Sequence, residues 1–191
     1  MSNFDSHSIG IFKDDLLTVK EFVKVAINTI IFNRWIINNN YICENSAINN
    51  ISYMNIKDDN LQNSIKRLLD NMSNLSKSDK NFQIDLEFYT QNQSYFWGLI
   101  QSKVYWEKWN ILVQISDEGS HNKEKNMREF LAKILKELNT DKDFMPDIKL
   151  ENFKDIEENK NDENKDFNFP YELNIKPCFS TEAFKNLSID K

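Results

Sequence analysis

Two segments in which apolar and polar residues alternate constrain the fold of this chain most. The apolar positions of the first segment are Phe82, Ile84, Leu86 and Phe88, and those of the second are Trp109, Ile111, Val113 and Ile115. Alternation with a period of two is typical of β-strands that bury one face. The segments 82–89 and 109–115 are therefore predicted to be strands that pair as a hairpin.

Three further segments carry apolar residues at helical spacing. They predict helices over residues 16–35, from residue 58 or 59 to residue 72, and over residues 123–138. The first of these is rich in β-branched residues over a wide face, so it is expected to be largely buried. The acidic pairs 14–15 and 58–59 precede two of the helices, where carboxylates can cap free backbone N–H groups.

Shorter strand candidates complete the pattern, at residues 8–12, 41–43, 51–56 and 169–177. The last is expected at a sheet edge, because proline interrupts it. The order of elements predicts an α+β fold, with a mainly antiparallel sheet packed against about three helices. The length of 191 residues favours a single domain over residues 1–191, with a flexible acidic loop at 151–168 and a tail at 181–191.

The composition argues against several classes of protein. A net charge of −6 gives the chain little attraction to nucleic acid or to anionic lipid. No apolar run approaches the roughly 18 residues of a membrane helix, and the N-terminus lacks the basic and apolar regions of a secretory signal. Cys43 and Cys178 lie far apart, and free thiols in a reducing compartment are the simpler interpretation.

The sequence offers little for catalysis, and no catalytic, cofactor-binding or metal-binding residue is predicted. His7 and His121 are expected to be solvated surface residues, the first in an N-terminal tail and the second in a turn. Neither cysteine has a neighbouring histidine, and no His/Cys spacing fits zinc. Capping or solvation accounts for the acidic pairs 14–15, 58–59 and 157–158 better than paired-carboxylate chemistry does.

The segment between the two predicted strands, residues 90–105, is unusual for a hairpin connection, because most hairpin loops have about two to five residues. Its centre contains the large apolar residues Tyr95, Phe96, Trp97, Leu99 and Ile100. In one interpretation the segment folds back onto the core or continues the strands. In the other it is a protruding finger whose aromatic tip enters a pocket of a partner protein, since Trp and Tyr bury much area at little entropic cost.

Two motifs flank this segment, Leu-Glu-Phe-Tyr at 86–89 and Trp-Glu-Lys-Trp at 106–109. Trp106 and Trp109 flank the second predicted strand on opposite faces, and both are expected to pack in the core or on the sheet. The two motifs, with an aromatic loop of this length between them, resemble the family of autophagy-related protein 101. The similarity spans most of the chain and extends to residues 31–34, 52–56, 144–146 and 170–175.

The resemblance implies a HORMA domain and a non-enzymatic adaptor in the kinase complex that starts autophagosome formation. Members of that family pair with the HORMA domain of autophagy-related protein 13, and they recruit downstream factors through a Trp-Pro-Phe-like finger. By position, Phe96 and Trp97 would form the finger here, although the order Phe-Trp-Gly lacks the proline and Leu99 and Ile100 extend the patch. The implied location is the cytoplasm, with recruitment to the preautophagosomal structure. No cofactor, nucleic-acid partner or transmembrane insertion is expected.

Two alternatives stay open. A different HORMA-type adaptor, acting in checkpoint or chromosome biology, would trap a partner peptide beneath a mobile C-terminal segment, and the short tail after Ile175 argues mildly against it. A small hydrolase that uses paired carboxylates would need a deep pocket and perturbed pKa values. The adaptor of autophagy initiation is the leading hypothesis.

Overall fold

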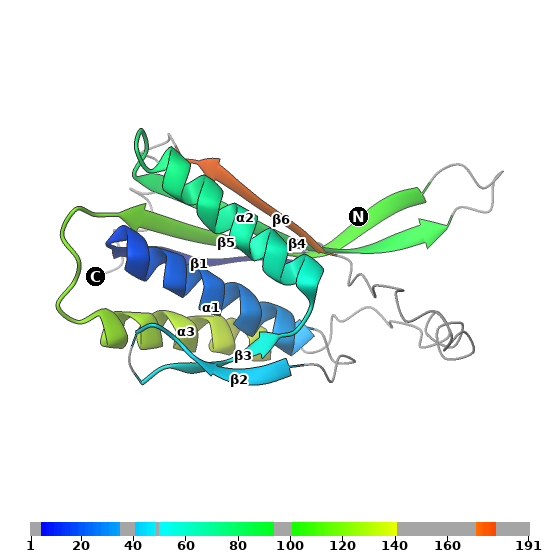
Figure 1. The fold of residues 1–191 in the computed structure, drawn as a ribbon. Helices are drawn as coiled ribbons and strands as arrows, with labels where there is room; N and C mark the ends of the chain where they lie inside the picture. Colours follow the sequence, from blue (N-terminus) through cyan, green and yellow to red (C-terminus); the bar gives the residue numbers. More distant parts are fainter. Residues whose placement is uncertain (1–4, 35–40, 49, 94–100, 141–170, 179–191) are drawn as a thin grey trace.

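The computed structural model describes residues 5–34, 41–48, 50–93, 101–140 and 171–178. Its elements are, in chain order, β1 (Asp5–Asp14), α1 (Leu16–Arg34), β2 (Tyr41–Asn45), β3 (Ser52–Ile56), α2 (Asp59–Leu75), β4 (Asn81–Gln93), β5 (Gln101–Ile115), α3 (Lys123–Thr140) and β6 (Tyr171–Pro177). Figure 1 shows α1 and α2 in front of one face of the main sheet. The predicted α+β class is confirmed. The predicted loop at 151–168 and tail at 181–191 lie outside the described residues.

Four strands form the main sheet, in the order β1-β5-β4-β6. β4 pairs antiparallel with β5 and β6, whereas β1 runs parallel to β5. The sheet is therefore mainly antiparallel, as predicted, and β6 lies at its edge, where proline is tolerated. β2 and β3 form a separate antiparallel pair.

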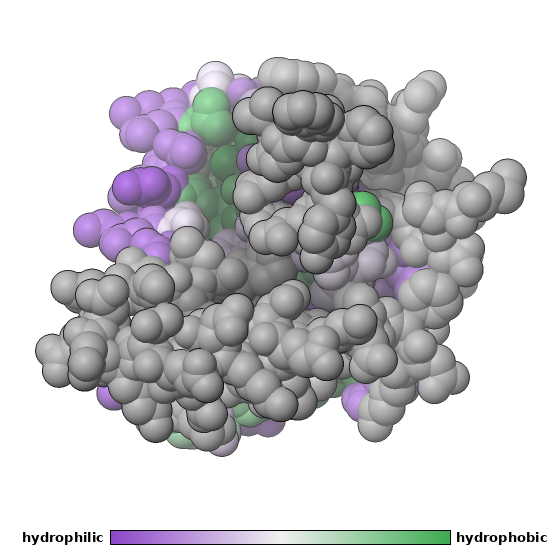
Figure 2. All heavy atoms as spheres, turned by 90° about the vertical axis from the view of Figure 1, so that its right-hand side faces the viewer, coloured by the Kyte–Doolittle hydropathy of each residue, from purple (hydrophilic) through white to green (hydrophobic). Residues whose placement is uncertain are grey.

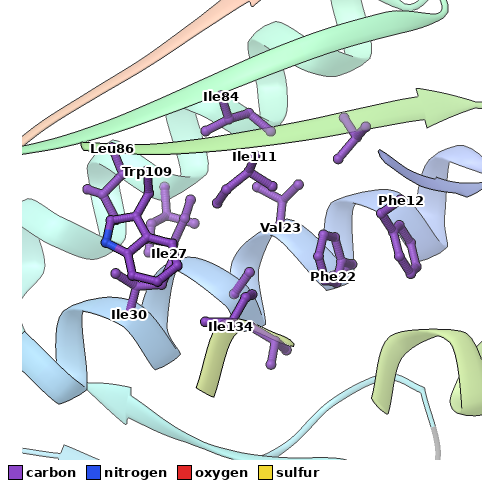
Figure 3. Close-up of a cluster of buried hydrophobic side chains, with 14 of the residues drawn as sticks. Phe12, Phe22, Val23, Ile27, Ile30, Ile84, Leu86, Trp109, Ile111 and Ile134 are labelled. Carbon is purple, nitrogen blue, oxygen red and sulfur yellow. The ribbon is translucent and has the colours of Figure 1, made fainter. Parts of the chain in front are cut away.

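α1 is the centre of the core. Its buried apolar residues are Val19, Phe22, Val23, Val25, Ala26, Ile27, Ile30 and Ile31. They surround the helix instead of following one stripe, because the main sheet, α3 and β3 all contact it. Figure 3 shows Trp109 and Ile111 of the sheet directed at Val23 and Ile27 of α1. Each large apolar side chain buried in this way stabilises the fold by about 1.5–3 kcal/mol, which explains why the helix tolerates so many β-branched residues.

Aspartates begin two of the helices as predicted. The Oδ1 atom of Asp15 accepts a hydrogen bond from the backbone N–H of Thr18 at 2.9 Å, and that of Asp58 accepts one from Leu61 at 2.7 Å. The capping interpretation of the pairs 14–15 and 58–59 is confirmed, while the pair 157–158 lies outside the described residues. Over the ranges that the structure describes, no helix has the length and apolar content needed to span a membrane.

β1 contains a bulge at Gly10. The register with β5 shifts between Ser8 and Ile11, and Gly10 has a φ of 86°, a conformation that glycine adopts without strain. The extra residue changes which side chains face inward. As a result His7, ahead of the bulge, and Phe12, beyond it, are both buried.

Candidate protein-binding hairpin

The strands β4 and β5 continue well past the positions that the sequence predicted. Backbone pairing runs from Tyr89 opposite Tyr105 to Gln93 opposite Gln101, so the outer parts of the segment 90–105 are strand. We call the paired residues 89–93 and 101–105 the hairpin arm. Figure 1 shows the arm projecting past the helices and away from the body of the domain. The apolar alternation that predicted the inner strands stops at the arm, because nothing there requires a buried face.

The predicted binding residues Tyr95, Phe96, Trp97, Leu99 and Ile100 lie outside the described residues. In the chain they lie between Gln93 and Gln101, which pair with each other as the last residues of the arm. Figure 2 views the molecule from the side to which the arm projects, and hydrophobic residues are visible there beside hydrophilic ones. On the arm itself, Val104 is 38 % exposed. The structure thus describes the arm that carries the predicted finger, while the finger residues themselves lie outside the described ranges.

A β-bulge at the base of the arm gives the hairpin a bend. Phe88 pairs with Glu107 but Tyr89 pairs with Tyr105, so Trp106 is an extra residue on β5. Its ring stacks on Phe88 with centroids 5.3 Å apart, which confirms that Trp106 packs on the sheet. Bulges increase the local twist and re-aim the strands that follow. The bulge therefore affects the direction in which the arm leaves the sheet.

Side chains of β6 brace the arm on one side. Glu172 forms an ion pair with Lys103 and accepts a hydrogen bond from the Tyr105 hydroxyl at 3.1 Å. The Lys103 ammonium also lies 4.5 Å from the centre of the Tyr89 ring. The contact with Lys103 lowers the pKa of Glu172. These groups are solvent-accessible, so each contact alone stabilises little, but together they join both strands of the arm to the body.

A buried charge cluster lies directly behind the bulge. The Arg34 guanidinium donates two hydrogen bonds to the Glu107 carboxylate, from Nε to Oε2 at 2.7 Å and from Nη2 to Oε1 at 2.6 Å. Its Nη1 lies 3.4 Å from the backbone carbonyl of Leu138. Both charged side chains are less than 5 % exposed. A bidentate pair of this kind fixes orientation as well as charge, so it ties the C-terminus of α1 to the base of the arm.

His7 completes this cluster, and the prediction that it is a solvated surface residue is wrong. The residue is 6 % exposed and its ring stacks on Trp109 with centroids 4.4 Å apart. Its Nε2 atom lies 3.2 Å from Oε1 of Glu107, and its Nδ1 atom 3.5 Å from Oε2 of Glu137. The Nε2 contact is close enough for an ion pair, although it does not meet hydrogen-bond geometry. The prediction failed because β1 begins at Asp5, earlier than the apolar residues at 9–12 indicate.

The contacts of His7 make folding depend on pH. The contact with Glu107 raises the pKa of the imidazole above its usual 6.5, against the effect of burial, and the charges of Glu107 and Glu137 add to the increase. Burial raises the pKa of Glu107, but its contacts with His7 and Arg34 outweigh burial and lower it overall. A raised histidine pKa means that the folded state binds the proton more tightly than the unfolded state. The stabilisation is therefore complete below pH 6.5 and is lost as the pH rises through the folded-state pKa.

The other positions singled out in the sequence agree with their predicted burial. Trp109 is fully buried and His121 is exposed, as expected. Cys43 and Cys178 are both free thiols, with Cys43 exposed on β2. The residues that sequence reasoning missed are Arg34 and Glu107. Both carried a signal, because Glu107 has the same parity as the buried positions of β5, and Arg34 follows the apolar face of α1 at helical spacing.

The chain matches a known protein family. A family model described as Autophagy-related protein 101 matches residues 13–152, more than half of the chain. The matched range contains both motifs at the base of the arm, 86–89 and 106–109, and also the Arg34–Glu107 pair. The resemblance inferred from those motifs is thereby confirmed. A comparison with curated proteins found no match.

Proposed function

Because the chain belongs to the family of autophagy-related protein 101, we propose that it is a non-enzymatic adaptor of the kinase complex that starts autophagosome formation. The observation that supports this role is the hairpin arm, which projects from the body and is braced at its base. A braced projection loses little conformational entropy when a partner covers it. The apolar residues 95–100, which connect its strands, are the partner-binding element of the proposal.

The second part of the proposal is pairing with the HORMA domain of autophagy-related protein 13. β2 is an edge strand of the small sheet, and its Tyr41 and Ile42 side chains are 42 % and 37 % exposed. An exposed apolar edge strand is a surface that a second domain can cover. Pairing of this kind leaves the arm free, so one adaptor can hold its partner domain and a downstream factor together.

The chemistry of the described residues favours binding over catalysis. The carboxylates of Asp15 and Asp58 cap helices, and that of Glu107 is held by Arg34. Groups already engaged in capping or buried ion pairs are poor general bases. From membership of the family we also propose that this adaptor works in the cytoplasm and is recruited to the preautophagosomal structure.

Co-purification of the full chain from its own cells, followed by mass spectrometry, tests this function. The expected result is enrichment of autophagy-related protein 13 and of subunits of the autophagy-initiating kinase. Enrichment of kinetochore or chromosome-axis proteins in their place would favour a HORMA adaptor of another pathway. The variant Tyr41→Ala tests the β2 surface separately from the hairpin arm. It is expected to lose autophagy-related protein 13 only if β2 takes part in that pairing.

A further inference from the structure

The buried charge cluster, formed by His7, Arg34 and Glu107 with the half-exposed Glu137 at its edge, lies where the hairpin arm leaves the sheet. Glu107 is in register with Phe88 of β4 and with Asp5 of β1. The bulged residue Trp106 directly precedes it. A bulge bends the strand that carries it, so the backbone at Trp106 and Glu107 affects the direction in which the arm leaves the sheet.

Charged groups from three elements face His7. Glu107 comes from β5 and Glu137 from α3, and Arg34 of α1 shares Oε1 of Glu107 with the imidazole. With a protonated His7 the four groups carry equal numbers of positive and negative charges. With a neutral His7 the carboxylates are in excess by one charge, and a buried carboxylate with fewer partners is costly.

The same cluster joins segments far apart in the chain. His7 belongs to β1, which pairs only with β5 within the described sheet, and Arg34 and Glu137 lie near the C-terminal ends of α1 and α3. His7 also stacks on Trp109, two residues beyond Glu107. Loss of the imidazolium charge thus weakens the attachment of β1 to β5 next to the bulge at Trp106.

We propose that this cluster is a latch that fixes the direction of the hairpin arm, and that it loosens when His7 loses its proton. The inference rests on the proposed function for its meaning, because an arm of fixed direction presents its end to a partner with less loss of entropy. A tighter arm in a more acidic environment would favour recruitment there. The raised pKa of His7 agrees with the direction of this effect.

The latch is tested by a distance measurement that needs no partner. One spin label is attached to the exposed Cys43 of β2 and a second to the arm through Val104→Cys, in a chain that also carries Cys178→Ser. Double electron–electron resonance then gives the distribution of distances at about pH 6 and about pH 9, on either side of the usual histidine range. The expected result is a narrow distribution at the lower pH and a broader or displaced one at the higher pH.

Two variants assign the effect to His7. With His7→Gln the distribution is expected to be broad at both pH values, whereas the exposed-site control His121→Gln is expected to respond as the labelled parent does. An unchanged parent distribution, or a pH response that persists in His7→Gln, would overturn the latch. If His7→Gln does not fold, the parent series decides alone. Because no partner is present, failure of the latch leaves the co-purification result unaffected, and the two proposals fail separately.

Discussion

Replacing Arg34 with methionine is expected to lower the free energy of unfolding by about 3–5 kcal/mol, because it leaves a buried carboxylate without its cation. The Glu107 side chain is 3 % exposed and receives two hydrogen bonds from the guanidinium. The remaining partner, His7, is itself titratable and contacts Glu107 through one nitrogen. Urea denaturation followed by circular dichroism measures the loss.

Two controls separate the buried charge from ordinary packing. The double variant Arg34→Met with Glu107→Leu removes both charges, and it is expected to recover much of the lost stability. Lys80→Met breaks the exposed ion pair with Asp117 and is expected to change the free energy of unfolding by less than about 1 kcal/mol. If Arg34→Met unfolds at the same urea concentration as the parent chain, the buried pair does not hold α1 to the base of the arm.

The second large effect is expected at the end of the hairpin arm. Changing Phe96 and Trp97 together to alanine is predicted to abolish co-purification of downstream factors, while autophagy-related protein 13 is retained. Each aromatic anchor at the centre of an interface is worth about 2 kcal/mol or more, so the two together weaken binding by about a thousandfold. Quantitative mass spectrometry of purifications from cells measures the ratio of the two classes of partner.

The stability of this double variant is as informative as its binding. Surface residues usually change the free energy of unfolding by less than about 0.5 kcal/mol, so its melting temperature is expected to match that of the parent. Tyr41→Ala is the matched control for the melting temperature, since it also removes an exposed ring, from β2, well away in sequence from the arm. A large fall in melting temperature for the Phe96 and Trp97 variant would instead place these rings in the core.

The elements that bury apolar surface could be predicted from the sequence. The alternation in 82–89 and 109–115 and the apolar face of 16–35 correspond to β4, β5 and α1, because hydrophobic burial imposes its period on each of them. The strand β6 was placed at an edge by its prolines, and the edge position is confirmed. Helix starts at Asp15 and Asp58 were predictable as well, since capping is a local interaction.

What the sequence did not predict depends on contacts between distant segments. Continuation of both strands into the hairpin arm was one of two open interpretations. The sequence could not decide between them, because backbone pairing alone extends β4 and β5 there, and backbone pairing leaves no apolar pattern. His7 was misplaced because its burial requires β1 to lie beside β5, a parallel pairing between residues about a hundred positions apart. The charge cluster needs four elements to meet, and no period in a single segment records such a meeting.

The proposal of an adaptor is tested most directly by mixing the full chain with the HORMA domain of autophagy-related protein 13 and following thermal unfolding. With the partner at about 100 times its dissociation constant, binding stabilises the chain by about 2.7 kcal/mol. For a domain of this size that gain corresponds to a rise in melting temperature of about 5–10 °C, and the Phe96 and Trp97 variant is expected to show the same rise. A melting temperature that stays unchanged on mixing would contradict the pairing on which the adaptor depends.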